Sequence, residues 1–189
     1  MISIQVQTAP FDPGQLTNDA HAGDPAIGAL VCFTGYVRDL SQQQTVEGLF
    51  LEHFPGMTEK SLQGIAEEAA RRWPLQRVHV LHRGGQLGLA EPIVFVAAAS
   101  MHREDAFQAC AFIMDYLKTH APFWKKEHTT PGSHWVEGRS SDLEAADIHA
   151  RQDVPLWGNS AMHGCQADFH QCRRAAQCRL RDPPGKLPT

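Results

Sequence analysis

The stretch MDYLKTHAPFWKKEHTTPGSHWVEGR, residues 114–139, decides the fold because a helix ends and a strand begins within it. Apolar residues recur through residues 101–120 over more than one stripe, and they predict a helix that is nearly buried. Pro122 interrupts this helical pattern. Residues 121–129 and 134–139 follow, and their composition predicts two strands joined by a turn.

Lysines lie on both sides of this break. Lys118 falls in the last turn of the predicted helix, where a cation also stabilises the helix dipole, so a purely structural role stays open. Alternation on the following strand predicts that Phe123 and Lys125 share one face and that Trp124 and Lys126 share the other. One of these two lysines is therefore expected to face the side on which Lys118 lies.

The rest of the chain shows strands and helices in mixed order. Residues 55–74 place apolar side chains at spacings of three and four, which predicts a helix with Thr58 as its N-cap and its end at Pro74. The other predicted elements are strands at 2–7, 26–38, 45–54, 77–83 and 93–100, a loop at 84–92 and a short helix at 141–150. This order is typical of the α+β class.

Two cysteines lie in predicted apolar elements and three lie near the C-terminus. Cys32 belongs to the strand at 26–38, which is predicted to be buried, and Cys110 lies on an apolar helix face, so both are interpreted as inert core residues. The spacings of the other cysteines and nearby histidines fit no zinc module, and no metal site or other cofactor is predicted. These residues are His163, Cys165, His170, Cys172 and Cys178.

Composition and charge limit the classes of function. The formal net charge is -4, which argues against a general nucleic-acid binder. No apolar run approaches the roughly 18–20 residues that cross a bilayer, and the N-terminal residues do not resemble a signal peptide, so a cytoplasmic protein is expected. Residues 1–150 predict one domain, whereas residues 151–189 lack periodicity and predict a disordered tail.

Further cations lie at the ends of predicted elements. His102 and Arg103 precede the first acidic residues of the helix at 101–120, where an incoming anion such as a phosphate would be stabilised. Arg38 ends the strand at 26–38, and Arg139 follows the last predicted strand. Spacing alone favours a solvated surface position for each of these side chains and leaves anion binding open as the alternative.

Several long motifs resemble the catalytic large subunit of molybdopterin synthase. They include FTGYVR at residues 33–38, LEHFPGMTEK at 51–60 and MDYLKTHAPFWKKE at 114–127, and the resemblance covers approximately residues 2–148. It implies an α/β hammerhead-like fold with an additional small antiparallel sheet. It also implies a central homodimer within a heterotetramer.

The resemblance implies a sulfurtransferase of molybdenum cofactor biosynthesis. A small ubiquitin-like carrier subunit would insert its C-terminal Gly-Gly tail, activated as a thiocarboxylate, into a pocket of the large subunit. Its sulfur would pass to cyclic pyranopterin monophosphate, and two transfers would form the dithiolene of molybdopterin. The sulfur arrives already activated, so no metal or other cofactor is expected, and neither nucleic acid nor membrane is an expected partner.

The resemblance also implies the site residues. Lys118 and Lys125 match the family's catalytic lysines, although acid–base, nucleophilic and thiocarboxylate-holding roles all stay open for Lys118. The substrate-binding positions are Arg38, His102, Arg103, Tyr36, Val37, Lys126, Glu127 and Arg139, the last of which would reach the pocket across the dimer interface. All are expected to converge on one electropositive cavity.

Two departures from the family pattern leave alternatives open. Tyr36 stands where some members are expected to have a lysine, and Pro92 stands where a strand is expected to begin. A carrier-binding module of the same fold without catalytic activity is therefore a second hypothesis. A metal-binding or interaction role housed in residues 151–189 is a third.

Overall fold

The computed structural model describes residues 1–41, 44–129 and 132–136. In chain order the described elements are β1 (Ile2–Gln7), α1 (Pro13–His21), β2 (Ala29–Tyr36), β3 (Leu40–Ser41), β4 (Gln44–His53), α2 (Met57–Arg72), β5 (Leu75–Arg83), β6 (Gly85–Leu87), β7 (Pro92–Ser100), α3 (Arg103–His120), β8 (Phe123–Thr129) and β9 (Gly132–Val136). Arg139, the helix predicted at 141–150 and the tail predicted at 151–189 lie outside the described residues. None of the described helices is both long and apolar enough to span a membrane.

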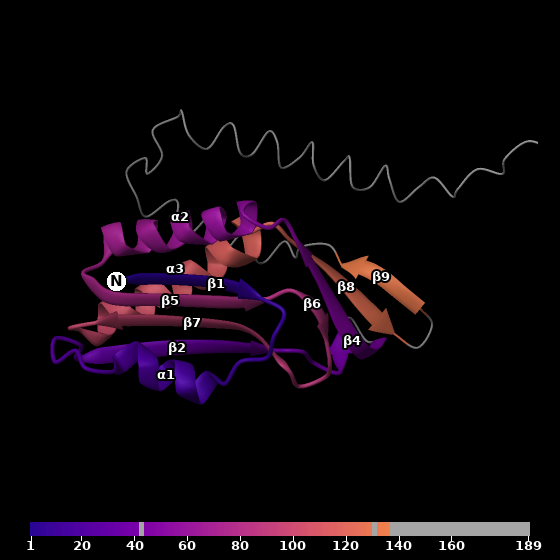
Figure 1. The fold of residues 1–189 in the computed structure, drawn as a ribbon, viewed down its shortest axis with the longest axis horizontal. Helices are drawn as coiled ribbons and strands as arrows, with labels where there is room; N and C mark the ends of the chain where they lie inside the picture. Colours follow the sequence, from indigo (N-terminus) through magenta and orange to yellow (C-terminus); the bar gives the residue numbers. More distant parts are fainter. Residues whose placement is uncertain (42–43, 130–131, 137–189) are drawn as a thin grey trace, which may run out of the picture. The chain divides into compact units, whose positions relative to one another are not determined.

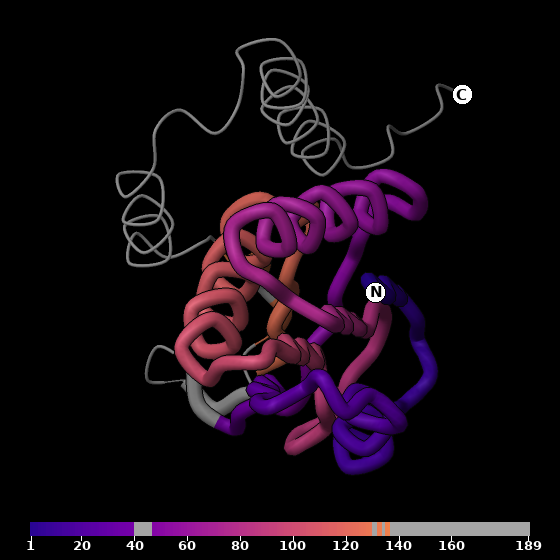
Figure 2. Tube along the Cα trace, turned by 90° about the vertical axis from the view of Figure 1, so that its left-hand side faces the viewer, coloured from indigo at the N-terminus to yellow at the C-terminus, as the bar shows by residue number. Residues whose placement is uncertain are grey.

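A mixed sheet forms the centre of the described fold (Figure 1). Its described strands lie in the order β1-β5-β7-β2, with β1 parallel to β5 and the other neighbours antiparallel. The helices α2 and α3 pack on one face of this sheet and α1 packs on the other, as Figure 2 shows from the side. The mixed α+β class predicted from the order of elements is confirmed.

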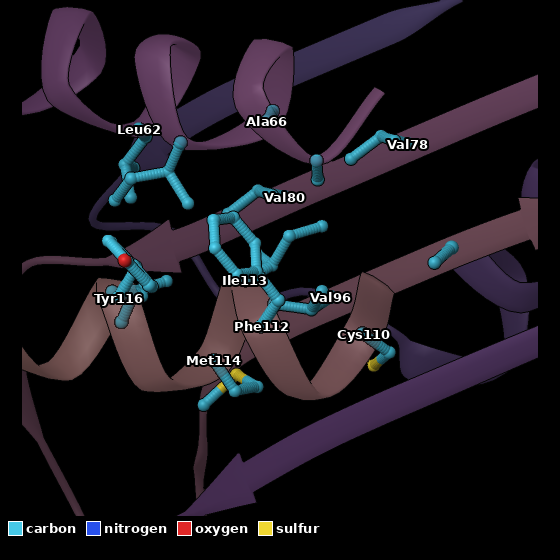
Figure 3. Close-up of a cluster of buried hydrophobic side chains, with 14 of the residues drawn as sticks. Leu62, Ala66, Val78, Val80, Val96, Cys110, Phe112, Ile113, Met114 and Tyr116 are labelled. Atoms are coloured by element: carbon cyan, nitrogen blue, oxygen red, sulfur yellow. The ribbon is translucent and has the colours of Figure 1, made fainter. Parts of the chain in front are cut away.

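The main core lies between this sheet and the pair α2 and α3 (Figure 3). Val80 of β5 and Val96 of β7 face Leu62 of α2 and Phe112 of α3, and all four are buried. Burying a side chain of this size contributes about 1.5–3 kcal/mol each. The helix at 101–120 is less enclosed than predicted, because its outer side exposes residues such as Phe107, whose exposed fraction is 62%.

A second, antiparallel sheet adjoins the first. Within the described residues, β3, β4, β8 and β9 lie side by side in this order, and β6 pairs with β4. Leu49, Leu51, Leu87 and Val37 form a small buried cluster at this sheet. The segment at 84–92 was predicted as a loop, and β6 corrects that prediction, because a strand of three residues is too short to show a clear alternation.

The strand β2 is not buried as predicted. It lies at the edge of the first sheet, and Phe33, Tyr36 and Cys32 are exposed. An edge strand has a neighbouring strand on one side only, so its side chains lose part of the cover that a central strand receives. The prediction that Cys32 is a core residue is therefore wrong, whereas the burial predicted for Cys110 is confirmed.

The start of α2 also differs from the prediction. Its N-cap is Gly56, whose φ of 83° lies in the left-handed region that favours glycine. The Gly56 N–H donates to a carboxylate oxygen of Glu59 at 2.5 Å, which satisfies one of the amides that a helix start leaves without a backbone partner. Thr58, the predicted N-cap, is buried within the first turn. The predicted end before Pro74 is confirmed, because α2 ends at Arg72.

Candidate functional site

The two lysines that the sequence singled out lie on either side of the junction between α3 and β8. The helix ends at His120, and Ala121 and Pro122 turn the chain into β8. The Ser61 hydroxyl of α2 donates to the His120 carbonyl at 3.1 Å, which satisfies one of the carbonyls at the helix end. Lys118 is exposed in this last turn, and its positive charge complements the negative end of the helix dipole.

Lys125 is held by a buried carboxylate. Its Nζ lies 2.5 Å from Oε1 of Glu127, whose side chain is buried, while the Lys125 side chain keeps 41% of its surface exposed. The two residues are two apart on β8, so they share one face of the strand. The ammonium group therefore sits at the border between the protein interior and solvent, in an orientation that a buried anion fixes.

An aromatic stack supports the same face of β8. The ring of Phe123 stacks on the ring of His82 with centroids 3.7 Å apart, and Phe123 packs against the main core. His82 is fully enclosed, and this burial lowers its pKa to about 4, because an interior without water disfavours the charged imidazole. Phe123 thus anchors the start of β8, two residues before Lys125.

Lys126 points to the opposite face of β8. Its Nζ lies 5.6 Å from the ring centroid of Trp135, its backbone partner on β9. Trp124, on the same face as Lys126, packs edge-on against Phe54 with centroids 5.3 Å apart. The predicted alternation is confirmed, so Lys126 does not share a face with Lys125.

The end of β2 carries another part of the predicted site. A register shift between Gly35 and Tyr36 interrupts the pairing of β2 with β7, and such bulges redirect the side chains that follow. Tyr36 and Arg38 are exposed, whereas Val37 is buried among the leucines of the second sheet. Val37 is therefore placed to anchor its two neighbours, and its side chain does not reach solvent.

His102 and Arg103 lie at the other end of α3. His102 is the N-cap, with no side-chain capping bond, and both residues are exposed. Arg103 and Lys118 are separated along the helix by about 22 Å at 1.5 Å per residue. The described residues of one chain therefore form two groups at opposite ends of α3. The single cavity expected from the sequence is not formed by these residues within one chain.

Sequence reasoning missed two charged residues near Val37. Arg83 is buried, and its guanidinium lies 3.0 Å from a carboxylate oxygen of Glu91. Glu91 lies within the segment at 84–92, which was predicted as a loop, and Arg83 directly precedes that segment. An arginine at the end of the strand predicted at 77–83 was the available signal. Among the described residues, no group of three or more histidine, cysteine or acidic side chains could hold a metal ion.

Comparison with known proteins identifies the family. The family model described as "MoaE protein" matches residues 6–120. This chain belongs to the MoaE family. A curated relative in the MoaE family, the molybdopterin synthase catalytic subunit of Pseudomonas aeruginosa, is 61% identical over 145 residues, which cover 77% of this chain and 97% of the relative.

Solved structures agree with this assignment. A molybdopterin biosynthesis MoaE protein from Burkholderia ambifaria is 50% identical and superposes with a TM-score of 0.67, covering 82% of this chain and 99% of the other. A chain from the complex of subunits 1 and 2 of the molybdopterin-converting factor of Helicobacter pylori is 17% identical, with a TM-score of 0.59 over 74% of this chain and 92% of the other. At that identity, the second likeness shows the MoaE fold alone.

Proposed function

We propose that this chain is the catalytic subunit of a molybdopterin synthase. It transfers sulfur from the thiocarboxylated C-terminus of a small ubiquitin-like carrier subunit to cyclic pyranopterin monophosphate. The observation that supports this most strongly is the ammonium of Lys125, fixed by buried Glu127 beside the end of α3, in a chain that is 61% identical to a molybdopterin synthase catalytic subunit. Two transfers produce the dithiolene, and the reaction takes place in the cytoplasm.

The charges of the reactants explain why cations are needed. The carrier tail and the cyclic phosphate are both anionic, and replacement of the phosphate linkage by sulfur expels an anion. Water then cleaves the bond between the carrier's acyl carbon and the transferred sulfur, so that the carrier leaves as a carboxylate. Cations that the fold has already oriented stabilise each of these negative charges without reorganisation.

The two lysines take different parts in this proposal. Glu127 holds Lys125 in one orientation, so Lys125 supplies a fixed positive charge to the anionic tail or phosphate. Lys118 lies exposed in the last turn of α3, and we assign it to the reacting sulfur. Its position is compatible both with holding the thiocarboxylate and with proton transfer. Lys126 faces the other side of β8, and we assign it to the rim of the site.

A second copy of the chain would complete the site. Four exposed residues of α3 have spacings that place them on one side of the helix. They are Arg103, Phe107, Ala111 and Lys118. An antiparallel, two-fold arrangement of α3 with its copy would bring His102 and Arg103 of one chain beside Lys118 of the other. The exposed Phe107 lies between the two cationic ends and would be covered in such a homodimer.

We extend the proposal to the whole assembly. Two chains and two carrier subunits form a heterotetramer, and the fold is of the α/β hammerhead type. Residues 1–150 form the functional domain, and residues 151–189 are an accessory tail, because the alignment of 145 residues already covers 97% of the Pseudomonas relative. The role of Arg139, which lies outside the described residues, is to reach the site of the partner chain.

The activity is tested with purified chain, thiocarboxylated carrier and cyclic pyranopterin monophosphate. Formation of molybdopterin and release of carrier carboxylate, both followed by mass spectrometry, are the expected results. Carrier binding without sulfur consumption would instead support the non-catalytic module. Truncation after Ala150 is expected to preserve both activity and assembly, and loss of either would give the tail a function.

The shared site is tested by mixing two impaired variants, at a substrate concentration low enough for the raised KM of Arg103→Ala to limit its rate. In a mixed dimer of Lys118→Ala and Arg103→Ala, both defects would fall in one site, and the other site would be intact. Random re-association should then restore about a quarter of the wild-type rate at low substrate concentration. If each site belonged to one chain, mixing would restore no activity.

A further inference from the structure

A buried arginine joins three segments next to the candidate site. The guanidinium of Arg83 donates to the carbonyls of Thr8 and Pro92 at 3.2–3.3 Å and to a carboxylate oxygen of Glu91 at 3.0 Å. Arg83 is enclosed, whereas the Glu91 side chain keeps 42% of its surface exposed. The hydrogen bonds of the Arg83 guanidinium therefore connect the ends of β1 and β5 to the start of β7.

Glu91 in turn closes the tight turn that precedes β7. Its carboxylate accepts from the Gly88 N–H at 3.1 Å, and its own N–H donates to the Gly88 carbonyl at 3.3 Å. Ala90, inside this turn, has a φ of 61°, which costs about 1–2 kcal/mol for a residue with a Cβ. Such a conformation persists when the surrounding contacts fix it, and Glu91 supplies two of these contacts, one through its carboxylate and one through its N–H.

The turn holds the residue before Arg38 by both of its backbone groups. The Val37 N–H donates to the Glu91 carbonyl at 3.0 Å, and the Ala90 N–H donates to the Val37 carbonyl at 2.9 Å. The Val37 side chain is buried below. The backbone from which Arg38 projects is therefore fixed to the turn and not to the regular pairing of β2, which the register shift at Gly35 has interrupted.

The same segment is connected to Lys125. β6, which lies between Arg83 and the turn, pairs with β4, and Leu51 of β4 lies opposite Gly85 on one side. On its other side Leu51 lies opposite Lys125 of β8. A change in the turn would therefore move Arg38 relative to a sheet that also positions Lys125.

We propose that Arg83 and Glu91 are positioning residues for sulfur transfer, which set the place of Arg38 relative to Lys125. The proposal rests on the proposed function, because it takes Arg38 as a group that binds the anionic pterin. Neither residue needs to contact the substrate. Their effect on the reaction passes through the turn, the backbone of Val37 and the guanidinium of Arg38.

The test compares Glu91→Ala with Glu91→Gln, which keeps an oxygen able to accept from Gly88 and Arg83. Glu91→Ala is expected to raise the KM for cyclic pyranopterin monophosphate by about 10- to 100-fold, the loss typical of a binding group displaced by about 1 Å. The kcat should change little, whereas the Tm should fall by about 2–4 °C, because the enclosed Arg83 guanidinium loses its carboxylate partner. Glu91→Gln should recover most of the affinity, and the surface variant Glu67→Ala should match wild type.

The decisive measurement is made in an Arg38→Ala background. If Glu91 acts through Arg38, adding Glu91→Ala to Arg38→Ala raises KM no further. Hydrogen exchange at the Val37 and Ala90 amides, measured by NMR, should accelerate in Glu91→Ala but not in Glu67→Ala. Equal KM increases in both backgrounds, or unchanged exchange, would overturn the positioning role. So would a KM that rises only in proportion to a loss of folded protein.

Failure of the two proposals can be told apart. An inactive wild-type protein overturns the proposed function and the positioning role with it. An active wild type whose Arg38→Ala variant has a normal KM keeps the proposed function and overturns the positioning role. An active wild type with an impaired Arg38→Ala and an unaffected Glu91→Ala overturns the positioning role alone.

Discussion

Replacing Glu127 by glutamine should separate the placement of Lys125 from the stability of the fold. Glutamine keeps the size of the side chain but removes the charge that lies 2.5 Å from the Lys125 ammonium. A hydrogen bond to a charged group contributes about 1.5–3 kcal/mol. The Lys125 side chain is 41% exposed, so solvent screening reduces this to about 1 kcal/mol. For a protein of this size, that loss lowers Tm by about 2–4 °C.

The expected loss of activity is larger than the loss of stability. Without the buried anion, the Lys125 ammonium moves toward solvent, and a displacement of about 1 Å costs on the order of 100-fold in rate. The assay is sulfur transfer from thiocarboxylated carrier, with Tm measured on the same samples. A wild-type kcat/KM in Glu127→Gln would refute the idea that Glu127 positions a catalytic cation.

A double variant sharpens this test. Lys125→Met alone removes a partner of the buried Glu127 carboxylate and should destabilise the fold by about 1–3 kcal/mol, because a buried charge loses part of its compensation. Adding Glu127→Gln removes that charge. The double variant should therefore be more stable than Lys125→Met, yet equally inactive. Additive losses of Tm would show that the two side chains are not coupled.

Further predictions concern the helix, the core and the cysteines. Lys118→Ala should abolish product formation with fold and dimer intact; near-wild-type turnover would remove Lys118 from the mechanism. Arg103→Ala should raise the KM for the precursor more than it lowers Tm, and the reverse result would indicate a structural role. Burial lowers the pKa of His82 from 6.5 to about 4, so the unfolded chain binds a proton that the folded chain excludes. The neutral buried His82 therefore costs no stability above about pH 6.5, and the folded state loses stability as pH falls from there toward 4. The Tm of His82→Leu should depend less on pH over that range than the Tm of the wild type. Alkylation followed by peptide mapping should label Cys32 in the native protein and Cys110 after unfolding, since Cys32 is exposed and burial raises the pKa of Cys110 to about 12.

Local patterns in the sequence were enough to predict most elements of the described fold. The spacing of apolar residues placed α2 and α3, and Pro122 correctly marked the change from helix to strand. Alternation on β8 correctly assigned Lys125 and Lys126 to opposite faces. These features follow from backbone geometry, which repeats every 3.6 residues in a helix and every two in a strand and needs no knowledge of distant segments. The resemblance to a known family also came from the sequence and is confirmed by the comparisons.

Other properties depend on which distant segments meet. The apolar run at β2 favoured a buried strand, but its place at the sheet edge exposes Cys32. Glu127 and Arg83 are buried charges whose partners became visible only once β8 and the turn before β7 were in place. The separation of Arg103 from Lys118, in contrast, follows from the length of α3 alone and could have been deduced from the predicted helix. The sequence alone determined the elements, the family and the residues to consider. The tertiary structure decided which of them are buried, because burial arises from contacts between segments far apart in the chain.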